Sequence, residues 1–203
     1  MAVWIFDVNE TLLDLGALDE PVFGGDTALR RRWFSQMIQS ALVTTVTGGY
    51  RPFGELGTAA LRMVAPEASA EALREALGSA PAWDDVRPAL DGLRARGDRL
   101  AALTQSMPDV LEAQLAAAGI ADRFEAALSV DGAKRFKPAP EPYRYACERL
   151  GVAPADATMV AAHTWDVAGA TAAGLQAVLV LRPGVVPDPS QPEPRTVGSL
   201  LDL

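Results

Sequence analysis

The pattern of apolar and polar positions divides the chain into three parts. Residues 3–6 form an uninterrupted apolar run, Val-Trp-Ile-Phe, and such a run is typical of a buried central strand. Residues 15 to about 81 show helical patterns and no convincing strand. From residue 83 onward, helical and strand-like stretches alternate. This alternation predicts a parallel sheet with helices on both of its faces.

Caps and glycine stops set the bounds of the predicted elements. Asp26 or Thr27 and then Ser69 are candidate N-caps, and several later helices are expected to end at a glycine. The predicted helices cover 26–47, 53–64, 69–77, 84–96, 108–118, 141–150 and 166–173, and the predicted later strands cover 99–103, 126–130, 158–162 and 177–181. The proline-rich tail from Pro183 is expected to be an extended surface segment.

We therefore predict an α/β fold, a doubly wound, Rossmann-like parallel sheet with a helical cap domain inserted after the first strand. Residues 1–14 and 82–203 are expected to form the catalytic core, and residues 15–81 the cap. An insert at this point lies over the carboxyl edge of the sheet, where ligands bind in open α/β folds. A cap there can exclude water and complete a pocket.

Composition and charge narrow the function. The 203 residues carry a net charge of -8, which argues against non-specific nucleic-acid binding because phosphate contacts need clustered cations. Cys147 is the only cysteine, so no disulfide within the chain is expected. The N-terminus does not resemble a signal peptide, and no apolar run reaches the ~18 residues needed to span a bilayer. We expect a cytoplasmic protein that binds neither nucleic acid nor membrane.

Polar residues follow several of the predicted strands. Asp7 ends the first strand, Thr104 and Gln105 follow the strand at 99–103, and His163 and Asp166 follow the strand at 158–162. Lys137 lies in a loop before the helix at 141–150. Strand ends converge on one crevice in a doubly wound sheet, so an Asp, a hydroxyl, a Lys and a second Asp are expected to meet there. Taken alone, Asp7 is equally well read as a turn cap.

Four motifs in this order resemble the haloacid dehalogenase superfamily of hydrolases, over the whole chain. The closer likeness is to its L-2-haloacid dehalogenase (type II) branch. Residues 6–14, Phe-Asp-Val-Asn-Glu-Thr-Leu-Leu-Asp, resemble the first motif of that branch. Residues 128–131, together with Phe-Lys-Pro at 136–138 and Tyr143, resemble the third, and residues 163–170 resemble the fourth.

Two positions separate this chain from the phosphatases of the superfamily. The phosphatases use a second Asp two residues after the nucleophile as acid and base, and here that residue is Asn9. In the fourth motif, Ala162 stands where the phosphatases have their first acidic metal ligand. Loss of a carboxylate argues against Mg²⁺, which prefers oxygen ligands. No metal and no cofactor are therefore expected, and Lys137 is expected to supply the positive charge.

The resemblance implies that Asp7 displaces a leaving group from a small 2-substituted carboxylic acid and that water then hydrolyses the aspartyl ester. Lys137 would keep Asp7 ionised, and Asp166 would orient or activate the water. Thr11 and Thr104 would bind the second oxygen of the nucleophile or the substrate carboxylate, beside Asn9. Tyr143 either supports the site or packs its ring in the core, and the residues leave both readings open.

Three positions depart from the branch. In that branch an Arg of the insert binds the leaving halide. When Tyr50 to Phe53 are aligned with the corresponding helix end of the branch, this Arg aligns with Phe34. Arg30, one helical turn earlier, is a candidate substitute. Arg30 is equally consistent with a solvated helix face. His163 replaces an Asn, and either transfers a proton near the nucleophile or is a structural residue bonded to nearby backbone. Gln105 replaces another Asn and lengthens a side chain of the halide pocket.

These residues are consistent with three functions. The leading hypothesis is a metal-independent hydrolase that resembles (S)-2-haloacid dehalogenase. The alternatives are a phosphatase with altered acid and base groups, and a non-catalytic member that binds a ligand in the cleft. Members of the branch often form dimers through the insert, so a homodimer is an open alternative to a monomer, and residues 41–43 fit either a dimer contact or the core of the cap.

Overall fold

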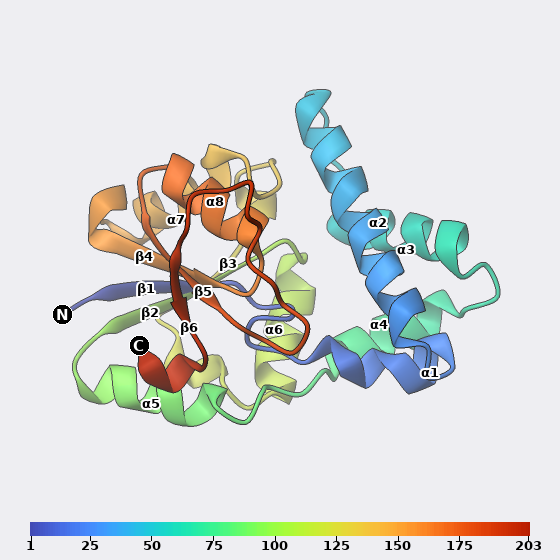
Figure 1. Cartoon of the computed structure of the whole chain (residues 1–203), viewed down its shortest axis with the longest axis horizontal. Coiled ribbons are helices and arrows are strands. Elements are labelled where there is room, and N and C mark those ends of the chain that lie inside the picture. Colours follow the sequence, from blue (N-terminus) through green and yellow to red (C-terminus); the bar gives the residue numbers. More distant parts are fainter.

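The computed structural model describes all 203 residues and contains one six-stranded parallel sheet in the order β3-β2-β1-β4-β5-β6. β1 (Val3–Phe6) lies in the middle of the sheet, and all four of its residues are buried, as expected for an uninterrupted apolar run (Figure 1). The other strands are β2 (Arg99–Thr104), β3 (Ala126–Ser129), β4 (Ala157–Ala161), β5 (Gln176–Val180) and β6 (Arg195–Val197). The predicted fold class is confirmed.

Helices cover both faces of the sheet. α5 (Val86–Ala95) and α6 (Pro108–Ala117) lie on one face, and α7 (Pro140–Leu150) and α8 (Thr164–Ala172) lie on the other (Figure 1). α7 ends at Gly151, whose φ of 66° is a left-handed conformation that glycine adopts without strain. No helix combines the length and the apolar character that crossing a membrane requires.

Four helices of the insert lie beyond the carboxyl ends of the strands. They are α1 (Asp19–Phe23), α2 (Thr27–Val46), α3 (Phe53–Val64) and α4 (Ala70–Gly78), on the right in Figure 1. The chain leaves and re-enters the core at adjacent points, because Leu13 forms an antiparallel bridge with Ala82 and the Trp83 N–H donates to the Leu12 carbonyl at 3.0 Å. We propose that residues 15–81 act as a cap over the remainder.

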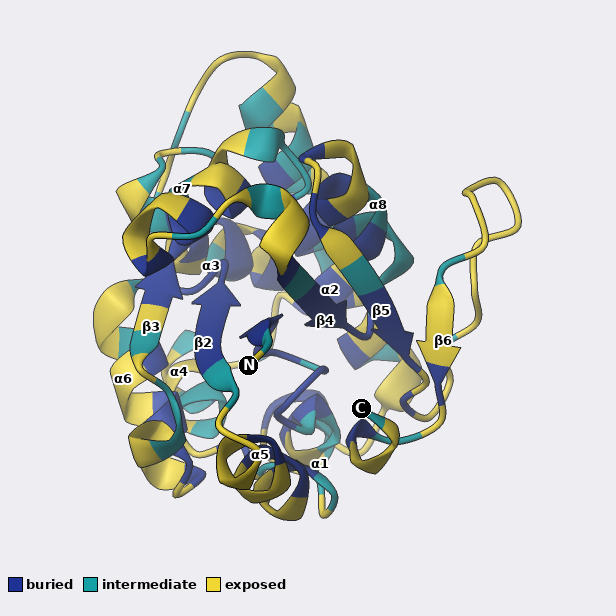
Figure 2. Cartoon of the chain, turned by 90° about the vertical axis from the view of Figure 1, so that its left-hand side faces the viewer, coloured by how far each residue is buried: buried dark blue, intermediate teal, exposed yellow.

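The structure bears out every predicted helix and strand, with bounds within two residues of those expected. Asp26 and Ser69 accept hydrogen bonds as N-caps of α2 and α4. Two regions differ. The short α1 and the preceding 3-10 helix, Leu15–Leu18, were not predicted because segments of four or five residues are too short to show a period. The tail forms β6, which is mostly exposed at the edge of the sheet (Figure 2) and forms because β5 offers unpaired backbone groups.

Candidate active site

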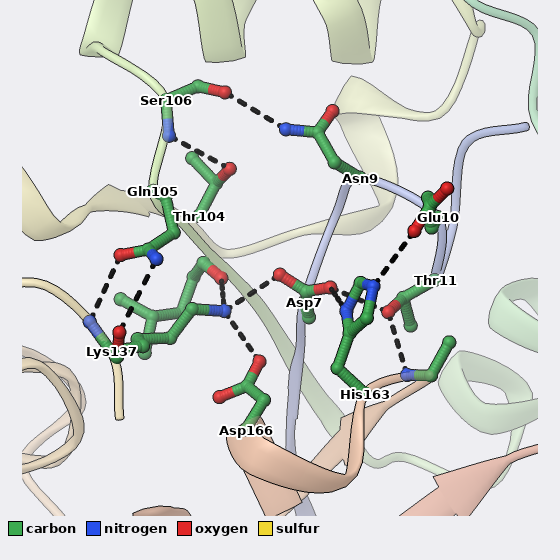
Figure 3. A network of polar contacts seen from close by, with 12 residues as sticks. Asp7, Asn9, Glu10, Thr11, Thr104, Gln105, Ser106, Lys137, His163 and Asp166 are labelled. Atoms are coloured by element: carbon green, nitrogen blue, oxygen red, sulfur yellow. Dashed lines mark hydrogen bonds and ion pairs between the residues drawn. The ribbon is translucent and has the colours of Figure 1, made fainter. Parts of the chain in front are cut away.

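Asp7 lies at the carboxyl end of β1 and is 4% exposed. Its Oδ1 accepts a hydrogen bond from Lys137 Nζ at 2.7 Å, and its Oδ2 accepts one from the Thr11 hydroxyl at 2.6 Å (Figure 3). Burial alone raises the pKa of Asp7, but the positive charges of Lys137 and His163 outweigh it and hold the pKa well below its usual range. Asp7 is therefore ionised and held in place, as a carboxylate nucleophile needs to be.

The Lys137 ammonium lies between two carboxylates. Its Nζ is 2.7 Å from Asp7 Oδ1, 2.7 Å from Asp166 Oδ2 and 3.1 Å from the Leu103 carbonyl. Burial alone lowers the pKa of Lys137, but the charges of Asp166 and Asp7 outweigh it and raise the pKa. Lys137 is therefore a permanent cation beside the nucleophile. No group of three or more His, Cys, Asp and Glu side chains is arranged to hold a metal ion.

Asp166 orients Lys137 from the first turn of α8. Its Oδ1 accepts a hydrogen bond from the Tyr143 hydroxyl at 2.6 Å, and its Oδ2 binds Lys137. Burial raises the pKa of Asp166, and the negative charge of Asp7 adds to this, against the effect of Lys137. The Tyr143 ring is fully buried and its hydroxyl reaches the site, so this tyrosine both packs in the core and supports the charged group.

Amide side chains hold the loops around this group. Gln105 binds the backbone of Lys137 twice, because its Oε1 accepts from the Lys137 N–H at 3.0 Å and its Nε2 donates to the Lys137 carbonyl at 3.4 Å. Asn9 donates to the Ser106 hydroxyl at 3.1 Å and accepts from Gln114 at 2.9 Å. The Thr104 hydroxyl accepts from the Ser106 N–H at 3.2 Å. These bonds fix the strand ends from which the site is built.

His163 approaches Asp7 from the start of α8. Its Nε2 is 2.9 Å from Glu10 Oε2, and its Nδ1 is 3.7 Å from Asp7 Oδ2, which is an ion-pair distance but too long for a hydrogen bond (Figure 3). Burial alone lowers the pKa of His163, but the carboxylates of Asp7 and Glu10 raise it to about 9. The structure thus favours the alternative in which His163 faces the nucleophile over a purely structural bond to backbone.

Arg30 lies apart from Asp7. Its Nη1 binds Glu10 at 2.8 Å and its Nε binds Asp19 at 2.6 Å, and the side chain is buried. These two carboxylates satisfy the guanidinium, and Arg30 does not line the cavity in front of Asp7. The structure therefore does not bring Arg30 into the position expected for a halide-binding residue, and it excludes a solvated helix face as well.

A narrow cavity in front of Asp7 has a water-sized space of only ≈ 10 Å³, about enough for one water molecule. A larger cavity of ≈ 760 Å³ adjoins it, and Phe34, Ile38, His163 and Trp165 line both. The narrow cavity is lined by Asp7, Asn9, Phe34, Ile38, Phe53, Thr104, Gln105, His163 and Trp165. The space in front of Asp7 therefore fits a water molecule and is too small for a larger substrate.

Several site residues were not singled out from the sequence. Glu10 belongs to the first motif, but only the fold shows that it contacts the single histidine of the chain. Ser106 gives a weak signal, as a hydroxyl that follows a predicted strand. Trp165, two residues after His163, stacks on its ring, and so does Phe34 of α2, which the sequence marked only as the position of the missing Arg. Nothing in the sequence reveals the Phe34 contact, because it joins the insert to the core.

Comparisons with known proteins identify the family of the chain. Residues 1–174 match the haloacid dehalogenase-like hydrolase family. The chain is 29% identical to (S)-2-haloacid dehalogenase 4A of Burkholderia cepacia, over 98% of this chain and 91% of that protein. It is 30% identical to haloacetate dehalogenase H-2 of Moraxella sp. (strain B), over 88% of this chain and 85% of that protein.

A solved structure extends the likeness to three dimensions. The L-2-haloacid dehalogenase RSc1362 matches with a TM-score of 0.90 at 28% identity, covering 100% of this chain and 96% of that chain. The resemblance inferred from the four motifs is thereby confirmed for the family and the fold. The chain belongs to the haloacid dehalogenase-like hydrolase family, and it is similar to the L-2-haloacid dehalogenases over nearly its full length.

Proposed function

We propose that the protein is a metal-independent hydrolase that removes the 2-substituent, in the first instance a halide, from a small 2-substituted carboxylic acid. The observation that carries this proposal is the pairing of Asp7 with Lys137 at 2.7 Å in a buried site. An ionised carboxylate with a fixed cation is suited to nucleophilic displacement at saturated carbon. The names of the similar proteins, (S)-2-haloacid and haloacetate dehalogenases, support the same substrate class.

The proposed reaction has two steps. An oxygen of Asp7 attacks C2 of the substrate, the bond from C2 to the halide breaks, and an ester forms between Asp7 and the substrate carbon. Halide leaves as a stable anion, so this step needs no proton donor. Water then attacks the ester carbonyl carbon and releases a 2-hydroxy acid. Lys137 stays charged throughout and stabilises whichever oxygen of the Asp7 group carries negative charge.

Asn9 argues against the phosphatase alternative. Its Nδ2 donates to Ser106 and its Oδ1 accepts from Gln114, so both ends of the amide are engaged. An amide has no acidic proton to give to a departing alkoxide.

Halide release from (S)-2-chloropropionate tests the proposal. We expect steady release by the wild type without added metal, and no release by Asp7→Asn. Asp91→Asn is the matched control, because this exposed carboxylate pairs only with Arg123 on the surface, and it should keep wild-type activity. Mg²⁺-dependent hydrolysis of p-nitrophenyl phosphate with no halide release would overturn the proposal in favour of a phosphatase. Binding of chloropropionate without turnover of either compound would favour a non-catalytic member.

A further inference from the structure

Asp166, the residue expected from the sequence to activate water, is poorly placed to accept a proton. Lys137 occupies its Oδ2 at 2.7 Å and the Tyr143 hydroxyl occupies its Oδ1 at 2.6 Å. The side chain is completely buried and does not line the cavity in front of Asp7. Asp166 is therefore a positioning residue for Lys137, and the group that takes the proton from water has to be found elsewhere.

His163 has the geometry that Asp166 lacks. It lines the cavity, and its Nδ1 faces Asp7 Oδ2 at 3.7 Å without a hydrogen-bond partner in the protein. A buried ring nitrogen without a partner is uncommon and calls for an explanation. The narrow cavity in front of Asp7 has room for about one water molecule, and water is the second reactant.

Three neighbours fix the orientation of the His163 ring. Phe34 of α2 stacks on it with a centroid distance of 5.3 Å, and Trp165 stacks on it at 5.1 Å. Glu10 Oε2 binds Nε2 at 2.9 Å and so keeps a proton on that nitrogen. When the ring loses its second proton, the lone pair is therefore on Nδ1, the nitrogen that faces Asp7.

Glu10 is itself held under strain. Its φ of 63° lies in the left-handed region, which is unfavourable for a residue other than glycine and persists only where the surroundings compensate. Arg30 Nη1 binds its other carboxylate oxygen at 2.8 Å. Arg30 therefore contributes to the site through Glu10.

We propose that His163, oriented by Glu10, is the proton-transfer residue for hydrolysis of the Asp7 ester, and that the charge of Asp7 decides when it acts. The inference rests on the proposed function, because it needs an ester on Asp7. While Asp7 is ionised, the carboxylates of Asp7 and Glu10 lie on the two nitrogens of the ring and the imidazole stays protonated, although Lys137 and Arg30 bind the other oxygens of those carboxylates. Esterification removes the negative charge of Asp7 and so favours release of the Nδ1 proton to solvent.

The hydrolytic step then balances in protons. The Nδ1 lone pair takes a proton from the water as its oxygen bonds to Cγ of the Asp7 ester. The bond from Cγ to the substrate oxygen breaks, and the departing alkoxide takes that proton from His163. The resulting Asp7 carboxylic acid passes its remaining proton to Nδ1, which restores the ion pair. One proton and one halide leave per cycle, as hydrolysis of a carbon–halogen bond requires.

Two substitutions at His163 test this assignment with (S)-2-chloropropionate. His163→Phe keeps an aromatic ring in the stack but cannot carry a proton, and His163→Ala leaves space for added imidazole. We expect both to release about one halide per site in a burst and then turn over about 10²–10⁴-fold more slowly than the wild type. Intact-mass measurement should show the ester on Asp7, and imidazole should restore turnover of the Ala variant.

Glu125→Gln is the matched control, because Glu125 pairs with Arg99 at the surface and contacts neither His163 nor Glu10. It should show no accumulated ester, whereas Glu10→Gln should accumulate some. Wild-type turnover by His163→Phe would overturn the assignment, as would loss of the burst together with turnover in a variant whose circular dichroism shows a native fold. Absence of halide release by the wild type would overturn the proposed function, and this inference with it.

Discussion

The Nδ1 atom of His163 lies 3.7 Å from Oδ2 of Asp7, so the single histidine of the chain is an electrostatic partner of the nucleophile. A second carboxylate, that of Glu10, binds the opposite side of the ring at 2.9 Å. Because both partners are negative, protonation of His163 stabilises the folded protein. The same contacts that arrange the ring for proton transfer thus link stability to pH.

Stability should fall as the pH rises from 6.5 to about 9. The pKa of His163 rises from 6.5 to about 9 on folding, so its contribution is fully present below pH 6.5 and is lost as the pH passes 9. This difference corresponds to about 3 kcal/mol of unfolding free energy. Urea unfolding of the wild type and His163→Phe across this range measures it. The pH-dependent loss of unfolding free energy should be smaller in His163→Phe than in the wild type by about this amount. Equal losses in the two proteins would contradict a protonated His163 in the folded state.

Removal of the Lys137 side chain should strongly destabilise the fold. Lys137→Ala leaves Asp7 and Asp166 buried without their shared cation, and breaking such a buried pair typically costs about 3–5 kcal/mol. Lys134→Ala is the matched control, since the exposed pair of Lys134 with Asp131 is worth less than about 1 kcal/mol. Urea unfolding compares the two variants. Equal losses of unfolding free energy would show that the buried ammonium of Lys137 stabilises the fold no more than an exposed one.

Phe34 should limit the size of the substrate. It belongs to the wall shared by the narrow and the large cavity, so Phe34→Ala is expected to join them. We expect the ratio of kcat/KM for 2-bromohexanoate to that for 2-chloropropionate to rise, with about 3–5 kcal/mol lower stability. Leu42→Ala is the control, because Leu42 lines only the large cavity. An unchanged ratio in Phe34→Ala would mean that this ring does not separate the cavities.

The local elements could be predicted because each has a signature in neighbouring residues. The apolar run 3–6 predicts β1, Asp26 and Ser69 predict helix starts, and Gly151 predicts a helix end, all of which the structure contains. Short segments such as α1 and β6 escaped because they show no period of their own.

The charged centre could also be expected in outline. Asp7 and Asp166 follow parallel strands and Lys137 precedes a helix, and the topology brings the carboxyl ends of those strands to one edge. Arg30 shows the limit of this reasoning. A helical spacing of four placed it beside Phe34, but its guanidinium pairs with Glu10 and Asp19, because the path of the chain before α2 brings those carboxylates closer than Asp7.

The sequence by itself determined three things: its apolar pattern predicted the fold, and the order of its motifs predicted the family resemblance and the residues of the charged centre. These depend on local patterns and on strand order. Only the tertiary structure decided that Nδ1 of His163 faces Asp7 and that both carboxylate oxygens of Asp166 already accept hydrogen bonds. His163 meets Glu10 across 153 positions of sequence, and its ring stacks on a side chain of the insert. The first contact depends on how β1 and β4 lie side by side and the second on how the insert lies beside the core, and no local pattern encodes either.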